Sequence, residues 1–398
     1  MDAAEKIAAL SRRYRDYVAG VLSEIVKIPS LSGDEEKVIA KLGEFLSDAG
    51  FDEVRVDPLG NLIGRIGSGP HKLAFDAHID VVDVGDPSQW DFDPFGGIIT
   101  GDKVLGRGAA DQKGGAASMV AAGKILKEIA YDGPFSLYFV FSIMEEDCDG
   151  MCWNFMIETG ELVPDFAVLT EPTNLGVYRG HRGRMEIEVY FKGRSAHGAM
   201  PHLGDNAVYK AARAALEFDR LNREDLGYDE FLGKGTMVVS QIVSGAPSLC
   251  AVPDRCKIHI DRRLTWGETK ESAIAEIKQI VGEDAEVVVP IYDKKSYRGV
   301  SHPQEKYFPT WKIEEDHPLV RSGVAAAEKV LGKVPAVGKW TFSTNGVAIA
   351  GKHKIPAIGF GPGNEIYAHA PNEFVPIDDL VVAAAFYALL PFELEKHL

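Results

Sequence analysis

The sequence predicts an α/β protein in two parts: a mixed-sheet αβα sandwich and an inserted domain with the ferredoxin-like β-α-β-β-α-β order. Runs such as LAFDAHI and LYFVFSI are apolar on both faces, as central strands covered by helices on each side must be. The later stretch MEIEVYFKG alternates strictly, which is typical of a strand with one solvated face. At 398 residues and 45% hydrophobic content, the chain is long enough for two such domains.

The first 180 residues alternate short apolar runs with helical segments. An amphipathic helix reaches about Lys27, and a proline stop followed by an acidic first turn at residues 29–36 introduces a second helix to about Gly50. The predicted strands are EVRVD, NLIGRIG, KLAFDAHID, FSLYFVFSI and DFAVLTE, with helices at 114–129 and 152–159 among the last three. In open α/β sheets of this kind, functional residues lie at or just after strand ends.

A segment that we call the insert occupies residues 181–296. Its predicted strands are MEIEVYFKG, TMVVSQIVSG, CKIHIDRRL and AEVVVPIY, and its helices span 206–218 and 268–281. The chain then returns with a helix at 317–331, a strand or loop TFSTNGVAIAG, a strand PAIGFGPG and a closing helix from Asp378. We therefore expect a discontinuous main body, residues 1–180 and 297–398, around the insert.

Composition excludes several classes of partner. A formal charge of −16 argues against nucleic acid and anionic membranes, because both attract basic surfaces. The N-terminal helix carries charges throughout and no apolar run approaches the length of a membrane span, so we expect a cytoplasmic protein. Four cysteines make no disulfide framework. Cys148 and Cys152, four residues apart, favour two reduced side chains, with redox control or a stray zinc site as alternatives.

Histidine and carboxylate side chains recur at the ends of the predicted strands of the main body. The set comprises His78 and Asp80 in KLAFDAHID, Asp111 in a glycine-flanked turn, Glu145 and Glu146 after FSLYFVFSI, Glu171 after DFAVLT, and His369 in YAHAPNE. Each alone is more often structural, but several carboxylates converging on one cleft require cations to offset the cost of burial. An imidazole at each end with carboxylates between them suits a pair of divalent cations.

The order and spacing of these residues resemble the two-zinc peptidase and amidohydrolase family that contains acetylornithine deacetylase, succinyl-diaminopimelate desuccinylase, aminoacylase and carnosinase-type dipeptidases. The resemblance covers nearly the whole chain and includes the connecting pattern Trp90, Asp93-Pro94-Phe95, Gly101, Gly106-Arg107-Gly108, Asp111 and Lys113-Gly114. Within the family, CAVPDRC, DRRLTWGE and EEDCDG look most like a poorly characterised branch named in connection with selenium metabolism.

The resemblance implies two divalent metal ions and a ligand set for each. Asp111 would bridge the ions, with His78 and Glu171 on one and Glu146 and His369 on the other. Zinc is the metal that the family implies. Nitrogen and oxygen ligands without thiolate are also compatible with cobalt or manganese.

Three further residues would act without binding metal. By resemblance, Glu145 is the general base that takes a proton from the metal-bound water. Asp80, two positions after His78, can hold the ring of His78 from behind. His197, in GRSAHGAMPHLGDNA, would reach the site of a neighbouring subunit and donate a hydrogen bond to the oxyanion. The resemblance thus makes the insert a lid and a dimerisation domain, and its half-solvated sheet has an edge strand that could pair with a second copy.

Arg263 in DRRL, Asn345 in STNG and Gly361 in GFGPG resemble substrate-facing positions. The guanidinium of Arg263 matches an α-carboxylate of a substrate with two parallel hydrogen bonds. The alternative for Arg263 is a surface salt bridge with Asp261 or Glu268.

We expect a dinuclear metal hydrolase that cleaves an amide bond in a small substrate, either a dipeptide or an N-acylated amino acid. Many relatives carry Asn at Cys250 and a Thr/Ser-Asp pair at Thr344-Asn345, so their substrate preferences do not transfer to this chain. One alternative is a non-catalytic homologue that acts as a binding or regulatory protein. Another is an aminopeptidase of related fold, which the insert argues against because we expect such enzymes to lack it.

Overall fold

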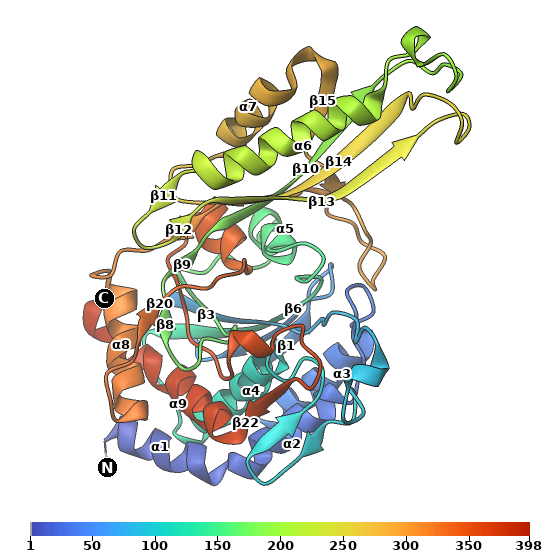
Figure 1. Cartoon of the computed structure of the whole chain (residues 1–398). Helices are drawn as coiled ribbons and strands as arrows, with labels where there is room; N and C mark the ends of the chain where they lie inside the picture. The colour runs from blue at the N-terminus through green and yellow to red at the C-terminus, as the bar shows by residue number, and fades with distance from the viewer. Residues whose placement is uncertain (1) are drawn as a thin grey trace.

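The computed structural model describes residues 2–398 and has two layered parts (Figure 1). The main body holds a large mixed sheet with helices on both faces, and both chain ends lie on it (Figure 1). The insert lies above it in this view, with its two long helices on the side away from the main body. The predicted fold class is therefore confirmed. The limits of the insert at residues 181 and 296 stay a prediction.

The large sheet has eight strands, and neighbouring strands follow the order β1-β2-β6-β3-β7-β21-β8-β20. In that order their bounds are Glu53–Val56, Leu62–Ile66, Phe135–Ser142, His71–His78, Phe166–Leu169, Ala357–Gly359, Val177–Tyr178 and Val337–Gly338. β3 runs parallel to both β6 and β7, whereas β2 runs antiparallel to β6. The carboxyl ends of β3, β6 and β7 therefore meet at one edge of the sheet.

Helices cover both faces of this sheet. Their bounds are α1 Ala3–Arg13, α2 Arg15–Val26, α3 Glu36–Asp48, α4 Lys113–Glu128, α5 Met151–Thr159, α8 Pro318–Leu331 and α9 Ile377–Leu394. α4 packs against α9, and with α1 and α2 they form the layer below the sheet in Figure 1. α5 contacts a short π-helix, η4 (Val347–Lys352), on the side that faces the insert.

Two predicted elements of the main body differ from the structure. The N-terminal helix is not continuous to Lys27, because Tyr14 leaves the helical conformation (φ −90°, ψ 15°) and separates α1 from α2. The stretch TFSTNGVAIAG, predicted as a strand or loop, contains η4. Its turn begins where the N–H groups of Val347 and Ala348 donate to the carbonyls of Thr344 and Asn345.

The insert forms the ferredoxin-like arrangement. Its elements are β10 Gly183–Lys192, α6 Ala207–Glu224, β13 Thr236–Gly245, β14 Arg255–Leu264, α7 Lys270–Val281 and β15 Ala285–Val288. The strands pair antiparallel in the order β13-β14-β10-β15, and β18 (Tyr307–Phe308) adds a short pairing to β10. Alternate residues of β10, among them Met185, Ile187 and Val189, are buried against α6 and α7 in a core separate from that of the main body. β13 is an edge strand.

The chain leaves and re-enters the main body at one place. β9 (Gly180–His181) pairs with β19 (Trp311–Lys312), so the outgoing and returning segments lie side by side. The remaining strands are β4 Ile98–Ile99, β5 Lys103–Leu105, β11 Tyr228–Asp229, β12 Gly233–Lys234, β16 Ile291–Tyr292, β17 Gln304–Glu305 and β22 Phe374–Pro376. The 3-10 turns are η1 Pro87–Gln89, η2 Pro201–Leu203, η3 Gly282–Asp284, η5 Glu365–Tyr367 and η6 Glu395–His397. Among residues 2–398, no helix combines the length and the hydropathy needed to span a bilayer.

Candidate dinuclear metal centre

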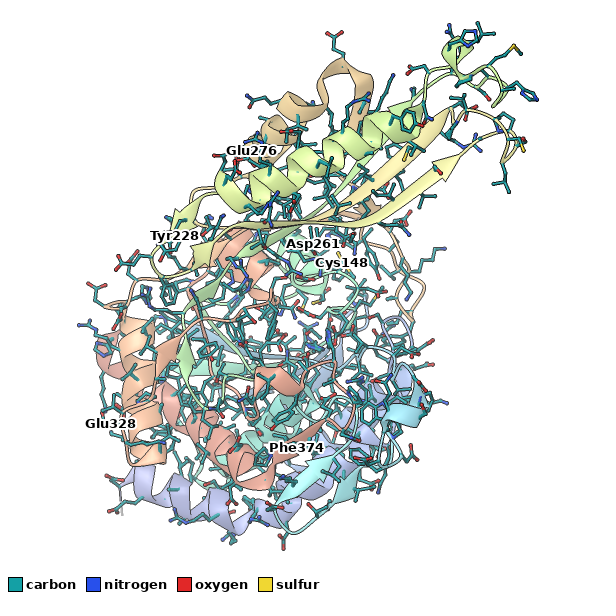
Figure 2. All side chains as sticks on the ribbon, viewed as in Figure 1. Cys148, Tyr228, Asp261, Glu276, Glu328 and Phe374 are labelled. Carbon is teal, nitrogen blue, oxygen red and sulfur yellow. The ribbon has the colours of Figure 1, made fainter. Side chains whose placement is uncertain are left out.

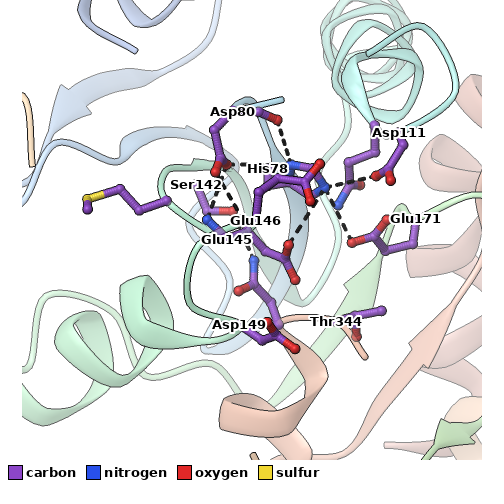
Figure 3. Close-up of polar contacts among 12 residues, drawn as sticks. His78, Asp80, Asp111, Ser142, Glu145, Glu146, Asp149, Glu171 and Thr344 are labelled. Atoms are coloured by element: carbon purple, nitrogen blue, oxygen red, sulfur yellow. Dashed lines mark hydrogen bonds and ion pairs between the residues drawn. The ribbon is translucent and has the colours of Figure 1, made fainter. Parts of the chain in front are cut away.

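The predicted site residues of the main body gather at the edge where three parallel strands end. His78 is the last residue of β3, Glu145 and Glu146 follow β6, and Glu171 follows β7. The parallel register of these strands brings their side chains together, although up to 93 positions separate them in sequence. Figure 3 shows all four pointing toward a common centre with Asp111, which precedes α4.

His78 faces three carboxylates. Its Nε2 lies 3.0 Å from Asp111 Oδ1, 3.6 Å from Glu171 Oε1 and 4.0 Å from Glu145 Oε2. On the other side of the ring, Nδ1 donates to the carbonyl oxygen of Asp80 at 2.9 Å. Because that N–H is engaged, a neutral His78 presents the lone pair of Nε2 to the carboxylates, as a metal ligand requires.

A second cluster forms around His369, which precedes β22. His369 Nε2 lies 3.0 Å from Glu146 Oε2 and 3.3 Å from Asp111 Oδ2. The two oxygens of Asp111 therefore face different histidines, Oδ1 toward His78 and Oδ2 toward His369. A carboxylate in this position can bind one ion through each oxygen.

Asp80 lies behind the centre and is fully buried. Its Oδ1 accepts from the backbone N–H of Glu145 at 3.2 Å, and its Oδ2 accepts from that of Glu146 at 3.1 Å (Figure 3). Ser32 Oγ donates to the same Oδ2 at 2.6 Å. Asp80 thus fixes His78 through its carbonyl and both glutamates through its side chain.

The charges of these groups are unbalanced without cations. Burial raises the pKa of Glu145 and of Glu171 well above the usual value for glutamate, and burial together with the charge of Asp111 raises the pKa of Glu146 to about 7. Hydrogen bonds to Asp111 and then Glu146 raise the pKa of His369 to about 10. Glu145 Oε1 and Glu171 Oε2 are buried and have no hydrogen-bond partner within residues 2–398. Buried carboxylate oxygens without donors fit a site made for divalent cations.

The centre opens into a cavity of ≈ 310 Å³. Two arginines of the insert, Arg184 on β10 and Arg263 on β14, line it and face each other across the paired strands. Asp149 and Glu365 also line it, and sequence reasoning had assigned no role to Arg184, Asp149 or Glu365. The alternation of MEIEVYFKG was the one available signal, because it extends back to place Arg184 on the solvated face of β10.

Arg263 both lines the cavity and forms an ion pair. Its Nε lies 2.7 Å from Asp261 Oδ1 and its Nη2 lies 3.2 Å from Asp261 Oδ2. Figure 2 marks Asp261 on the side of the insert sheet that faces the main body. Both readings of Arg263 made from the sequence, substrate contact and salt bridge, are thus compatible with its position.

Three other predicted residues lie away from the cavity of their own chain. Asn345 is buried, and its amide nitrogen donates to Asp76 Oδ2 at 2.9 Å while its oxygen accepts from the N–H of Gly150 at 2.9 Å. Gly361 packs so closely on the Glu171 backbone that a Cβ would lie 2.1 Å from the Glu171 carbonyl oxygen. His197 is exposed in the loop between β10 and α6 and is not among the residues that line the cavity.

Comparison with known proteins places the chain in a family. Residues 74–392 match the family model "Peptidase family M20/M25/M40". The chain is 50% identical over 383 residues to the uncharacterized protein YgeY of Escherichia coli (strain K12), covering 95% of each protein. It is 30% identical over 378 residues to a succinyl-diaminopimelate desuccinylase of Dinoroseobacter shibae, covering 92% of this chain and 96% of the relative.

Solved structures with the same fold share less sequence. Aminopeptidase PepT from Bacillus cereus has a TM-score of 0.73 at 21% identity and covers 96% of this chain and 98% of its own. Human carnosine dipeptidase 1 has a TM-score of 0.72 at 16% identity and covers 100% of this chain and 99% of its own. The fold and the family match agree with the strand-end residues described above, and the chain belongs to peptidase family M20/M25/M40.

Proposed function

We propose that this protein is a dinuclear metal hydrolase that cleaves an amide bond in a small substrate, either a dipeptide or an N-acyl amino acid. The observation that carries the proposal is the position of Asp111, whose two oxygens lie 3.0 Å from His78 Nε2 and 3.3 Å from His369 Nε2. Buried carboxylates complete a cluster on each side. Membership of a peptidase family and similarity to a desuccinylase support amide hydrolysis.

We assign His78 and Glu171 to one ion and Glu146 and His369 to the other, with Asp111 shared. The 3.6 Å separation of His78 Nε2 from Glu171 Oε1 and the 3.0 Å separation of His369 Nε2 from Glu146 Oε2 support this division. When bound, the ions would supply an activated water nucleophile and polarise the substrate carbonyl. The donor set favours zinc and is also compatible with cobalt or manganese.

Glu145 is the general base in this proposal. It belongs to the same buried group as His78 and Glu171, yet its Oε1 has no partner among the described residues. A carboxylate beside the metal ligands that is not tied up in hydrogen bonds can take a proton from water and pass it to the leaving amine. Glu146, one residue further on, faces His369 instead.

The cavity sets the size and orientation of the substrate. A volume of ≈ 310 Å³ suits a dipeptide or an acylated amino acid better than a long peptide. In this proposal, Arg263 reads the free carboxylate from the roof of the cavity. Asn345 and Gly361 would not touch the substrate. They would support the site indirectly, by holding the segments that carry Asp76 and Glu171.

A homodimer would complete the site. The edge strand β13 and helix α6 leave large apolar side chains in solvent, with Val238 56% exposed and Leu216 70% exposed. Such a face, beside unpaired backbone groups on β13, suits a second copy of the chain. His197 would then act on the partner's substrate, which accounts for its absence from the cavity of its own chain.

An aminopeptidase remains the second candidate. We expected the insert to argue against it, but this expectation was wrong: the fold of aminopeptidase PepT from Bacillus cereus matches 96% of this chain, too much to leave out the insert. The non-catalytic alternative is disfavoured because each predicted ligand and Glu145 are present at the centre.

The test is a substrate screen with purified, metal-loaded protein. The panel contains dipeptides, N-acetyl and N-succinyl amino acids, and tripeptides, and release of free amine is measured against a Glu145→Gln protein prepared in parallel. Hydrolysis of dipeptides or N-acyl amino acids by the wild type alone supports the proposal. Turnover of tripeptides only would favour the aminopeptidase. No turnover by protein that holds its metals would favour the non-catalytic homologue.

A further inference from the structure

The backbone at the end of β6 is held by buried side chains from distant parts of the main body. Ile143 N–H donates to Asn61 Oδ1 at 3.1 Å, and Met144 N–H donates to Glu35 Oε1 at 3.1 Å. The next two N–H groups are those that donate to Asp80. Four consecutive N–H groups are therefore each fixed by a side chain, and all lie at or directly before the two glutamates of the site.

Met144 is the residue that needs this support. It is buried and has a φ of +59°, in the left-handed region that residues other than glycine seldom adopt. Such a conformation is strained and persists only where the surroundings impose it. Because Met144 directly precedes Glu145, its conformation sets the direction in which Glu145 leaves the sheet.

Glu35 makes its contact with Met144 from inside the main body. It is fully buried, and the same Oε1 that accepts from Met144 also accepts from Gly33 N–H at 2.8 Å. Its neighbours in the segment 30–35 contact the end of β3: Ser30 Oγ donates to the carbonyl of Ile79 at 2.7 Å, and Ser32 Oγ donates to Asp80. One short segment before α3 therefore joins the ends of β3 and β6, two of the three strands that carry the site.

Asn61 has other structural duties, which makes it a poorer probe. Its amide nitrogen donates to Asp57 Oδ2 at 2.7 Å, and the N–H groups of Gly60 and Asn61 both donate to Asp57 Oδ1. These bonds shape the turn between β1 and β2. A change at Asn61 would disturb that turn as well as Ile143, whereas Glu35 makes its contacts through one oxygen.

We propose that Glu35 is a positioning residue for the hydrolysis proposed above: by holding Met144 N–H, it keeps Glu145 aimed at the substrate without touching substrate or metal. This inference rests on the proposed function. Glu35 does not line the cavity, and its sequence position, 109 residues before Met144, gives no hint of the contact. Glu35 is expected to affect the rate of the chemical step and to leave metal binding and KM largely unchanged.

Three substitutions separate the acceptor from the charge and from bulk stability. Glu35→Gln keeps an oxygen that can accept from both N–H groups. Burial, then the charge of Asp80, raises the pKa of Glu35 to about 8. The uncharged side chain of glutamine therefore resembles the state of Glu35 near neutral pH. Glu35→Ala removes the acceptor. Glu35→Asp keeps the carboxyl group but withdraws it by one methylene. The matched control is Glu393→Ala, which removes another buried glutamate of the main body, one that pairs with Lys329 and Lys396.

The expected result is a loss in kcat of about tenfold to a hundredfold for Glu35→Ala and Glu35→Asp, with metal content equal to wild type and KM within about twofold. Glu35→Gln and Glu393→Ala should stay within about threefold of wild type. An unchanged kcat in Glu35→Ala, loss of metal, or a Glu35→Gln protein as slow as Glu35→Ala overturns the proposal. If Glu35→Ala does not fold, the kcat values of the other two variants decide the matter. A higher kcat for Glu35→Gln than for Glu35→Asp supports the proposal, and the reverse order overturns the proposal.

Amide hydrogen exchange gives a readout that needs no turnover. A peptide spanning residues 143–146 should exchange slowly in wild type and in Glu35→Gln, and faster in Glu35→Ala and Glu35→Asp. Inactive wild-type protein with this exchange pattern would reject the proposed function and leave the contact established. Equal exchange in all variants would reject the role of Glu35, whatever the enzyme does.

Discussion

Arg184 Nη1 lies 3.5 Å from Asp149 Oδ1 and joins the first strand of the insert to the segment that follows Glu145 and Glu146. The Asp149 side chain is 5% exposed and that of Arg184 is 18% exposed, so the pair is largely shielded from solvent. Arg184 Nη2 also donates to Glu186 Oε1 at 3.0 Å. The segment that carries Glu145 and Glu146 and the insert are thus connected through a charge pair in the wall of the cavity.

Removing Arg184 should destabilise the protein by leaving Asp149 buried without its partner. Arg184→Met is expected to lower the unfolding free energy by roughly 3–5 kcal/mol, the usual cost of breaking a buried pair from one side. A double variant with Asp149→Asn should recover much of this loss. Thermal unfolding of both proteins checks the expectation. Arg220→Met is the control, because Arg220 pairs with Glu217 in solvent, where such pairs are worth about 0–1 kcal/mol. A cost no larger than that of the control contradicts the prediction.

The roles of Glu145 and Asp111 predict opposite effects on metal content. Glu145→Gln should retain both ions while kcat falls by at least ~10²–10⁴, as expected for a positioned acid–base group. Asp111→Asn should lose metal, because a neutral amide cannot bridge two cations as a carboxylate does. Elemental analysis of the dialysed proteins measures the metal content of both variants, and steady-state kinetics measures the kcat of Glu145→Gln. A missing ion in Glu145→Gln would make Glu145 a ligand and overturn the assignment.

The site residues that the sequence predicted were found by two different signals. His78 and Glu171 end or follow apolar runs, and parallel strands bring such ends together, so the position of these residues could be inferred from hydrophobic pattern alone. Asp111 and His369 lie in loops, and only their resemblance to a family motif identified them. The division into a sandwich and one insert was predicted from a change in the strands after residue 180: earlier strands are apolar on both faces, and later ones alternate apolar and polar residues.

The parts that were missed depend on packing between distant segments. Glu35 gave a local signal for the start of a helix, and its bond to Met144 exists only once the segment before α3 lies against the end of β6. Asp149 and Arg184 come from different parts of the fold, and each reads as an ordinary surface charge in sequence. Periodicity states which face of a strand is wet. It cannot state that the wet face of β10 lies over a cavity.

Metal binding should release protons near neutral pH. In the metal-free protein, burial opposes but the charges of Glu171 and the other carboxylates raise the pKa of His78 well above 6.5, and that of His369 is raised to about 10. Both imidazoles therefore hold a proton at pH 7 that a metal ion must displace. Zinc titrations by calorimetry in buffers of different ionisation enthalpy should detect this release, and affinity should increase with pH. Binding without proton release contradicts the assignment of these histidines.

The same shifts set the pH dependence of the metal-free fold. Because the folded pKa values of His78 and His369 lie above the unfolded value of 6.5, their protonation stabilises the fold fully below about pH 6.5. The contribution of His369 is lost as the pH rises through about 10, and that of His78 is lost as the pH rises through its own raised pKa. The unfolding free energy of chelator-treated protein should therefore decrease as the pH is raised across this range.

A dimer that shares its sites should show complementation. His197→Ala and Glu145→Gln proteins are each expected to be nearly inactive. A mixed dimer contains one site with both residues intact and one site with both residues changed. Each mixed dimer should therefore have up to about half of the activity of a wild-type dimer. The activity of the mixture, measured after mass spectrometry verifies heterodimer formation, tests this. Mixtures no better than either parent would mean that His197 serves its own subunit or has no catalytic role.

Arg263 should discriminate substrates by their free carboxylate. Asp261 accepts from Nε and Nη2 of Arg263, which orients the guanidinium in the wall of the cavity. Charged hydrogen bonds contribute roughly 1.5–3 kcal/mol, so Arg263→Lys should lower kcat/KM about tenfold or more for substrates with a free α-carboxylate. Their amidated analogues should be little affected, because they offer no anion to bind. Parallel kinetics on one substrate and its amide measure the difference. Equal losses on both would show that the pair with Asp261 holds the insert in place and does not read the carboxylate.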